Sequence, residues 1–298
     1  MLREPVLLIS GIAAGALLSG HVPGYVSKLA PVFLVLMLWG AMLTLPPTRV
    51  LSVMQNRRVV VLNLLVNFTV IPVLAFLMSL RFASQPELML GLFLYLALPC
   101  TDWFLTFTSM ARGSVAQGVL LIPVNLSLQL ALLPLYLLLF YGASVPFSWK
   151  LFAETLLLFF LLPLLMAFTS KRVFPSKLNL LISRAQTLFL SLAVMCILAS
   201  QQSIYRSILE LFPVFGLVIV YFALVLPLSH LLSRIFNLKR EEAILLYFTT
   251  SARNSPVALA VAMGTFPGMP LIHTLLALMP VIEVPVLVLV ARFLSVKR

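Results

Sequence analysis

The sequence predicts an all-α membrane protein with ten transmembrane helices, on three observations. The first is composition, because 62% of the residues are hydrophobic and 9% are charged, whereas about 25% of residues in soluble domains are charged. The second is length, since a helix needs about 20 apolar residues to cross a bilayer and the chain has 298 residues. The third is the sorting of basic residues between connections. A soluble globular domain is therefore excluded.

The first five predicted spans are apolar runs bounded by charged, proline or glycine residues. The first run follows the charged start of the chain and lacks the small-x-small cleavage site of a signal peptide, so we expect it to remain as a helix. Connections that contain basic residues separate the others. The five runs are Pro5 to Leu18, Pro31 to Leu45, Val59 to Leu80, Leu88 to Met110 and Ser114 to Tyr141.

The last five predicted spans follow the same pattern. Basic residues bound the sixth to ninth runs, and the sequence PGMP separates the ninth from the tenth. No linker or low-complexity segment interrupts them. The five runs are Leu151 to Phe168, Leu178 to Ala199, Leu209 to Leu232, Glu242 to Phe266 and Leu271 to Leu294.

Basic residues sort to one side of these ten spans. Fifteen of the 20 Lys and Arg residues fall in connections on one side and four on the other, with Arg253 inside the ninth span. Cytoplasmic loops carry the excess of Lys and Arg, so both termini are expected in the cytoplasm, with the spans in the inner (plasma) membrane. The net charge of +12 thus reports orientation and does not indicate a nucleic-acid partner.

The fourth and ninth spans each have a proline at their middle, beside an ionisable side chain. Pro99 precedes Asp102, the only aspartate of the chain, and Pro256 follows Arg253. Proline removes a backbone donor and clashes with the preceding turn, so we expect both helices to be broken there. Charged groups at mid-bilayer are costly, and a mutual Asp102–Arg253 pair is the least costly arrangement. A packing kink and a purely structural ion pair remain as alternatives.

The spacing of these two prolines predicts an internal repeat. They lie about half a chain length apart, and an odd number of spans in each half turns the second half over relative to the first. Residues 1–141 and 151–298 are therefore expected to form two inverted five-helix repeats within a single transmembrane unit, as in secondary transporters. Ser255 is expected to be the N-cap of the second half-helix, whose positive end suits an anion.

Other polar residues within the spans are candidates for the same site. Cys100, beside the first proline, offers a soft thiol ligand. Glu283 either exchanges protons or has a structural role, as a partner of Arg253 or as a protonated acid bonded to helix backbone. Asn67 and Asn125 either line a cavity or join helices. The two cysteines and three scattered histidines do not form a metal site, and no ATPase or nucleophile motif is present. We therefore expect neither an enzyme nor a cofactor.

The segments PCTDWFLTFTSMARG, SARNSPVALAVAMGTF and PVIEVPVLVLVARF resemble the superfamily of bile acid:sodium symporters and arsenite-efflux permeases. The resemblance implies ten helices in two inverted repeats with two crossing, broken helices. It also implies a core domain from spans 3–5 and 8–10 (about 59–141 and 209–294). A panel domain would come from spans 1–2 and 6–7 (about 5–45 and 151–199).

Particular residues resemble the arsenite-efflux branch more closely than the sodium symporters. The sequence Ala-Arg-Asn at the second break, Cys100 at the first and Glu283 in the tenth span match that branch, whereas Val257 and Asp102 depart from it. The sodium symporters place a Glu and a Gln in the ninth span and hydroxyl or amide groups in the fourth and fifth. This chain has Thr249, Arg253, Phe104, Leu105 and Ile122 at the corresponding positions.

The sequence thus predicts a secondary active transporter that exports arsenite, or a related small oxyanion or metalloid, by alternating access in exchange for H+, with Na+ less favoured. Its partners would be this small substrate and the lipid bilayer. There are two alternatives. One is a symporter-like transporter of a small organic anion, with Na+ as a candidate coupling ion, and the other is an uncoupled channel. The expected substrate ligands are Cys100, Thr101, Arg253, Asn254, Ser255, Asn125 and Asn67, and the expected proton carriers are Asp102 and Glu283.

Overall fold

The computed structural model describes residues 3–44, 57–142, 145, 147–201 and 204–296. Over these residues the regular structure is helical and contains no strand; an isolated antiparallel bridge joins Pro99 to Arg253. The prediction of an all-α protein is confirmed. Arg49, Lys297 and Arg298, which contribute to the predicted charge asymmetry, lie outside the described residues.

Seven helices among the described residues are long and apolar enough to cross a membrane. The predicted first, fourth and ninth spans correspond instead to shorter apolar helices, Val6–Leu18, Pro86–Ala97 and Ser255–Thr265. The last two are short because the chain leaves the helix near the middle of each predicted span. The seven long helices are Gly24–Leu43, Arg58–Phe82, Val115–Tyr141, Trp149–Val173, Ser176–Ala199, Ile208–Ile235 and Pro270–Val296.

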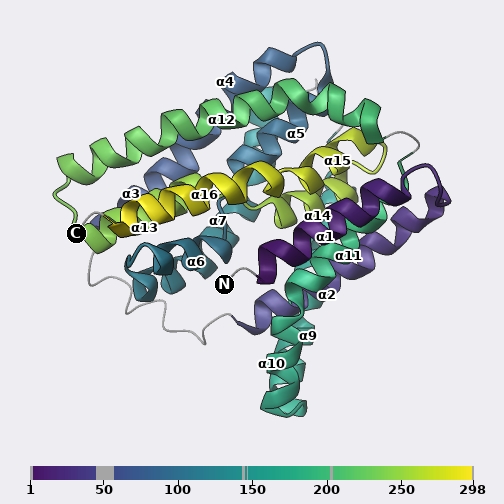
Figure 1. Cartoon of the computed structure of the whole chain (residues 1–298), viewed down its shortest axis with the longest axis horizontal. Helices are drawn as coiled ribbons and strands as arrows, with labels where there is room; N and C mark the ends of the chain where they lie inside the picture. Colours follow the sequence, from purple (N-terminus) through teal and green to yellow (C-terminus); the bar gives the residue numbers. More distant parts are fainter. Residues whose placement is uncertain (1–2, 45–56, 143–144, 146, 202–203, 297–298) are drawn as a thin grey trace. The chain divides into compact units, whose positions relative to one another are not determined.

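The described chain divides into two compact units, of which the first comprises Met1–Leu45, Pro146–Phe212 and Pro256–Leu278. Helix α11 (Gln186–Ala199) packs on α1 (Arg3–Leu18), α2 (Ala30–Leu43) and α15 (Pro270–Leu278) (Figure 1). Gly11 and Gly15, one helical turn apart, face α11; a Cβ at Gly15 would lie 2.9 Å from the carbonyl oxygen of Met195. This close approach is typical of small residues at membrane helix contacts. The unit also contains α8 (Trp149–Leu156), α9 (Leu162–Val173), α10 (Ser176–Arg184) and most of α14 (Ser255–Thr265).

The second unit comprises Pro46–Val145, Pro213–Ser255 and Met279–Arg298. Helix α13 (Arg240–Ser251) contacts α3 (Arg57–Leu65), α6 (Trp103–Met110), α7 (Val115–Tyr141) and α16 (Pro280–Val296), while α5 (Pro86–Ala97) packs on α4 (Ile71–Ser79). The long helix α12 (Ile204–Ile235) enters this unit at Pro213. Both nonhelical interruptions described below belong to it.

A π-helical segment, Val66–Val70, joins α3 to α4 and was not predicted from the sequence. Pro72 has no N–H with which to bond the carbonyl of Phe68, one turn earlier. The hydroxyl of Tyr136 on α7 donates to that carbonyl instead, at 2.7 Å. A carbonyl freed by proline inside a membrane helix is thus satisfied by a side chain from a neighbouring helix.

Candidate functional site

Two nonhelical stretches of the second unit cross each other. One lies between α5 and α6 and contains Pro99; the other lies between α13 and α14, immediately before Pro256. The main-chain N–H of Cys100 donates to the carbonyl of Ala252 at 3.1 Å, and that of Asn254 donates to the carbonyl of Leu98 at 2.8 Å. Each interruption therefore satisfies backbone groups of the other, as burial within a membrane protein requires.

Arg253 lies at this crossing with 2% of its surface exposed. Its Nη1 donates to the carbonyl of Leu96 at 3.0 Å, and its Nη2 donates to the carbonyls of Thr249 at 3.1 Å and Thr250 at 2.6 Å. These carbonyls belong to the last turns of α5 and α13, where helix carbonyls lack intrahelical partners. The guanidinium thus caps two helix C-termini at once, and its positive charge faces the negative ends of both.

Two further groups hold the guanidinium. Nη2 of Arg253 donates to Oδ1 of Asn67 at 2.8 Å, and the Cζ atom lies 5.7 Å from the ring centroid of Tyr221. The hydroxyl of Tyr221 donates to the carbonyl of Thr250 at 2.7 Å, so the ring is fixed beside the cation. Asn67 belongs to the π-helical segment, a type of distortion that is frequent at functional sites.

Glu283 on α16 contacts the main chain of Arg253 rather than its guanidinium. Its Oε1 accepts from the N–H of Arg253 at 2.8 Å, and its Oε2 accepts from the hydroxyl of Tyr95 at 3.0 Å. The side chain is 3% exposed. A carboxyl group held between two donors joins α16, α5 and the second interruption. The contact of Glu283 with Arg253 is thus a bond to the main chain.

Asp102 occupies a different environment, at the start of α6. Its Oδ1 accepts from the main-chain N–H of Trp103 at 2.8 Å and from the thiol of Cys100 at 3.7 Å. The side chain caps the helix, and the positive end of α6 favours its carboxylate. Asp102 and Thr101 are partly exposed, whereas Cys100 is buried. Asn254 donates from Nδ2 to Oγ1 of Thr101 at 3.0 Å.

The expected Asp102–Arg253 ion pair is wrong: the guanidinium contacts main-chain carbonyls, Asn67 and the Tyr221 ring, and Asp102 is not among its partners. The physical reason is the polarity of the broken helices. The interruptions place helix C-termini around Arg253 and a helix N-terminus beside Asp102, so each charge faces a helix end of opposite sign.

A row of buried amides leads away from Arg253. Asn67 donates from Nδ2 to Oδ1 of Asn63 at 3.0 Å, and Asn63 donates to Oδ1 of Asn125 at 2.8 Å. Within the described part of the chain, Nδ2 of Asn125, both amide atoms of Gln129 and Nε of Arg253 are buried without a protein partner. Groups of this kind are normally satisfied by internal water or by a ligand.

Most of the predicted site residues therefore lie in the second unit, but Arg253 and Asp102 do not have the partners that the sequence predicted. Ser255, expected as an N-cap, is the first residue of α14, and Pro256 belongs to the first unit. No group of three His, Cys, Asp or Glu side chains suited to a metal ion occurs among the described residues. Sequence reasoning missed Asn63, Tyr95 and Tyr221. Asn63 could have been found, because it precedes Asn67 by four residues and so shares its helix face.

A comparison with protein families matches residues 31–237 to the sodium bile acid symporter family. The match covers more than half of the chain and includes Pro99, Cys100 and Asp102; it ends before Arg253 and Glu283. No curated protein matches the chain.

Proposed function

The chain belongs to the sodium bile acid symporter family, and from this premise we propose that it exports a small oxyanion or metalloid, arsenite in first place, in exchange for protons. The family and the seven long apolar helices make it an integral membrane protein of the bile-acid-symporter transporter type. The substrate, the direction and the coupling to protons are the parts that we propose.

The proposal includes alternating access between a core and a panel domain, built from ten spans in two inverted repeats. Two observations support it. The chain is nonhelical both around Pro99 and immediately before Pro256, so apolar segments in corresponding halves are interrupted, as in inverted-repeat transporters. The described chain also separates into two compact units. One difference from the expected division is that Pro256–Leu278 packs with the first unit.

The observation that carries the proposal is the contrast between Arg253 and the Cys100–Asp102 pair. Two helix C-termini that converge inside a membrane form a site of negative potential that suits a cation. Arg253 fills this role with a charge that is never lost, so we propose transport that does not require sodium. Asp102, which is partly exposed and accepts the hydrogen bond of the Cys100 thiol, is then the group available to exchange protons.

The thiol and the carboxylate together suit trivalent arsenic. Arsenous acid, As(OH)3, would react with the Cys100 thiol to form an S–As bond, while one As–O bond breaks. Asp102 would take the thiol proton and return it to the departing hydroxide, which leaves as water. The arsenic stays trivalent, so no oxidant or reductant is needed. Thiolate is the soft ligand that this type of ion favours, and an adjacent base is the usual means of activating a thiol.

Proteoliposomes with imposed gradients test this proposal. We expect arsenite flux to follow an imposed pH gradient and to be indifferent to a sodium gradient. Asp102→Asn should abolish the response to pH, and Cys100→Ser should abolish arsenite transport, whereas the matched control Cys196→Ser on α11 should transport normally. Sodium-driven flux, or full activity of either site variant, would refute the corresponding part. Flux that neither saturates nor follows a gradient would instead indicate a channel.

A small organic anion is the second candidate, and the unpartnered donors of the second unit favour it. Three buried donors have no acceptor: Nε of Arg253, Nδ2 of Asn125 and Nε2 of Gln129. The oxygens of a bound carboxylate would provide acceptors for such donors. Thermal unfolding of the purified protein with arsenite or with a panel of carboxylates separates the two candidates. Arsenite should also protect Cys100 from alkylation in a Cys196→Ser background if the first is right.

A further inference from the structure

A pocket of about 540 Å³ opens where α12 ends and α13 begins, and its ten lining residues all belong to the second unit. It lies away from the crossing at Arg253 along the chain and shares no residue with it. Helices α12 and α16 lie in two of the long apolar helices, Ile208–Ile235 and Pro270–Val296. Both have more residues, 28 and 27, than the roughly 20 that cross the hydrocarbon core, so their ends at Ile235 and Val296 would reach the depth of lipid headgroups.

The turn between α12 and α13 brings two arginines to this pocket. Asn237 adopts a left-handed backbone with φ 47°, and the N–H of Leu238 donates to the carbonyl of Ser233 at 2.9 Å. These are the features of a Schellman motif, which ends a helix and reverses the chain. Helix α13 consequently begins at Arg240, six positions after Arg234, and both residues line the same pocket.

The polar side chains of the pocket are held in defined positions. Nε of Arg234 donates to Nε2 of His230 at 3.1 Å, so this ring nitrogen is the acceptor and Nδ1 carries the proton. In that tautomer Nδ1 donates to the hydroxyl oxygen of Tyr247, at 2.6 Å. Nη2 of Arg240 donates to the carbonyl of Leu294, at the end of α16, at 2.9 Å.

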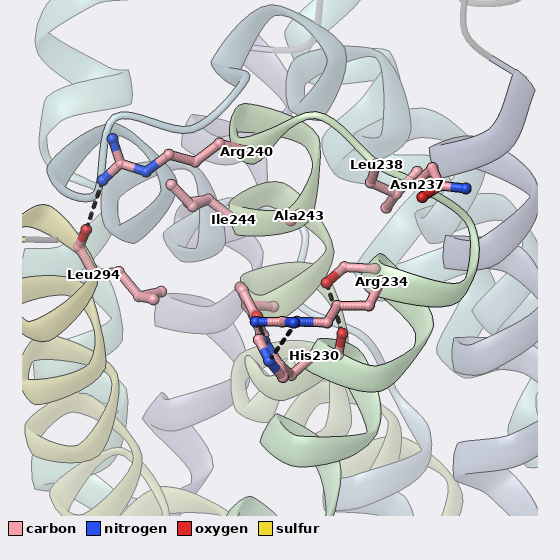
Figure 2. A pocket seen from close by; sticks show the side chains of 10 residues that line it. His230, Arg234, Asn237, Leu238, Arg240, Ala243, Ile244 and Leu294 are labelled. Atoms are coloured by element: carbon pink, nitrogen blue, oxygen red, sulfur yellow. Dashed lines mark hydrogen bonds between the residues drawn. The ribbon is translucent and has the colours of Figure 1, made fainter. Parts of the chain in front are cut away.

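The lining combines positive charge with an apolar wall. Figure 2 shows Arg240 on one side of Ala243 and Ile244, and Arg234 with His230 on the other. Two of the ten described residues that line the pocket, Arg234 and Arg240, are basic, and none of the ten has a carboxylate; the remaining lining residues are Ser233, Asn237, Leu238, Tyr247 and Leu294.

We propose that this pocket binds a phosphate group. Guanidinium groups match the oxygens of phosphate with paired, charge-assisted hydrogen bonds. The apolar wall of Ala243, Ile244 and Leu294 suits the glycerol and upper acyl carbons that accompany the phosphate of an anionic phospholipid. Basic pockets between membrane helices at the cytoplasmic surface recognise such headgroups. A free phosphate is the other source of the same chemistry.

The full-length protein tests this in detergent micelles that contain either phosphatidylglycerol or phosphatidylcholine, with the thermal unfolding midpoint as the measurement. We expect phosphatidylglycerol to raise the midpoint of the parent protein. The double variant Arg234→Gln, Arg240→Gln should need at least about tenfold more lipid for the same effect, as the loss of charge-assisted hydrogen bonds implies. The matched control Lys177→Gln, Arg184→Gln removes two exposed charges from α10 and should titrate like the parent.

A parallel titration with inorganic phosphate distinguishes the sources. Stabilisation by phosphate that is lost in the double variant would assign the pocket to the free ion, and an effect of phosphatidylglycerol alone would assign it to lipid. Equal responses of the parent and the double variant, or no response of the parent to either probe, would overturn the proposal. If the double variant does not fold, the single variant Arg240→Gln is tested instead, because it keeps the hydrogen bonds that join Arg234, His230 and Tyr247. An affinity of this variant for phosphatidylglycerol and phosphate equal to that of the parent would overturn the proposal.

Discussion

The two interruptions of the second unit differ in how their charges are used. Arg253 is buried and bonded to the last turns of α5 and α13 and to Asn67. Asp102 is partly exposed and sits at the start of α6 beside a thiol. A charge that caps two helices holds the crossing together, whereas a charge at an accessible helix start can exchange partners. In the proposed function the first interruption would supply the reactive groups and the second the framework.

The largest expected effect comes from removing the framework charge. Arg253→Met would leave the carbonyls of two helix ends and Oδ1 of Asn67 without a donor. We expect the free energy of unfolding to fall by about 3–5 kcal/mol, because each buried acceptor left unpaired costs about 1–3 kcal/mol. Thermal or denaturant unfolding in detergent measures this. Arg81→Met, at an exposed turn, is the matched control and should change stability by less than about 0.5 kcal/mol. Similar losses for both variants would break the comparison.

Asn67 should matter because it accepts from the guanidinium. Asn67→Ala should lower the free energy of unfolding by about 1.5–3 kcal/mol, the range for hydrogen bonds to charged groups. In the Arg253→Met background the same substitution should cost much less, since the two effects share one interaction. Asn254→Ala, which loses the bond to Thr101, should cost about 0.5–1.5 kcal/mol. Additive effects of the Asn67 and Arg253 substitutions would contradict the predicted coupling.

Tyr95 tests the link between α5 and Glu283. Tyr95→Phe removes the donor to Oε2 while keeping the ring, so we expect a loss of about 1.5 kcal/mol in the free energy of unfolding. Tyr25→Phe, at a side chain that is 67% exposed, should leave stability unchanged. A silent Tyr95→Phe variant would mean that Glu283 is held by the main chain of Arg253 alone.

The smallest effect on stability is expected at Asp102. Asp102→Ala removes a helix cap and should cost about 1 kcal/mol, whereas Asp102→Asn keeps a capping oxygen and should be close to neutral. Unfolding midpoints of the two variants, measured side by side, separate the cap from the charge. If Asn proved as costly as Ala, the charge of Asp102 would be part of the framework after all, and the contrast with Arg253 would disappear.

The sequence was sufficient for the helical class and for the location of both interruptions. Pro99 and Pro256 lack the N–H that a continuous helix needs, and each stands near an ionisable side chain in the sequence. Proline alone does not decide, because α7 and α16 continue through Pro123, Pro134 and Pro285. The partners of the central residues could not be deduced in the same way. The predicted Asp102–Arg253 pair rests on formal charge, and the positive helix ends at the breaks were expected to serve an anion. The carbonyls at the C-terminal ends of α5 and α13, which hold Arg253, were not part of that prediction.

Local covalent chemistry and hydrophobicity act over a few residues, so the chain by itself determined the helical class and which segments are apolar enough to cross a membrane. Tertiary structure decided which carbonyls each broken helix presents to Arg253, that Tyr95 reaches Glu283 and that a Schellman turn brings Arg234 and Arg240 to one pocket. These contacts join residues from helices distant in sequence or reversed by a turn, and their electrostatics depend on the direction in which each helix ends.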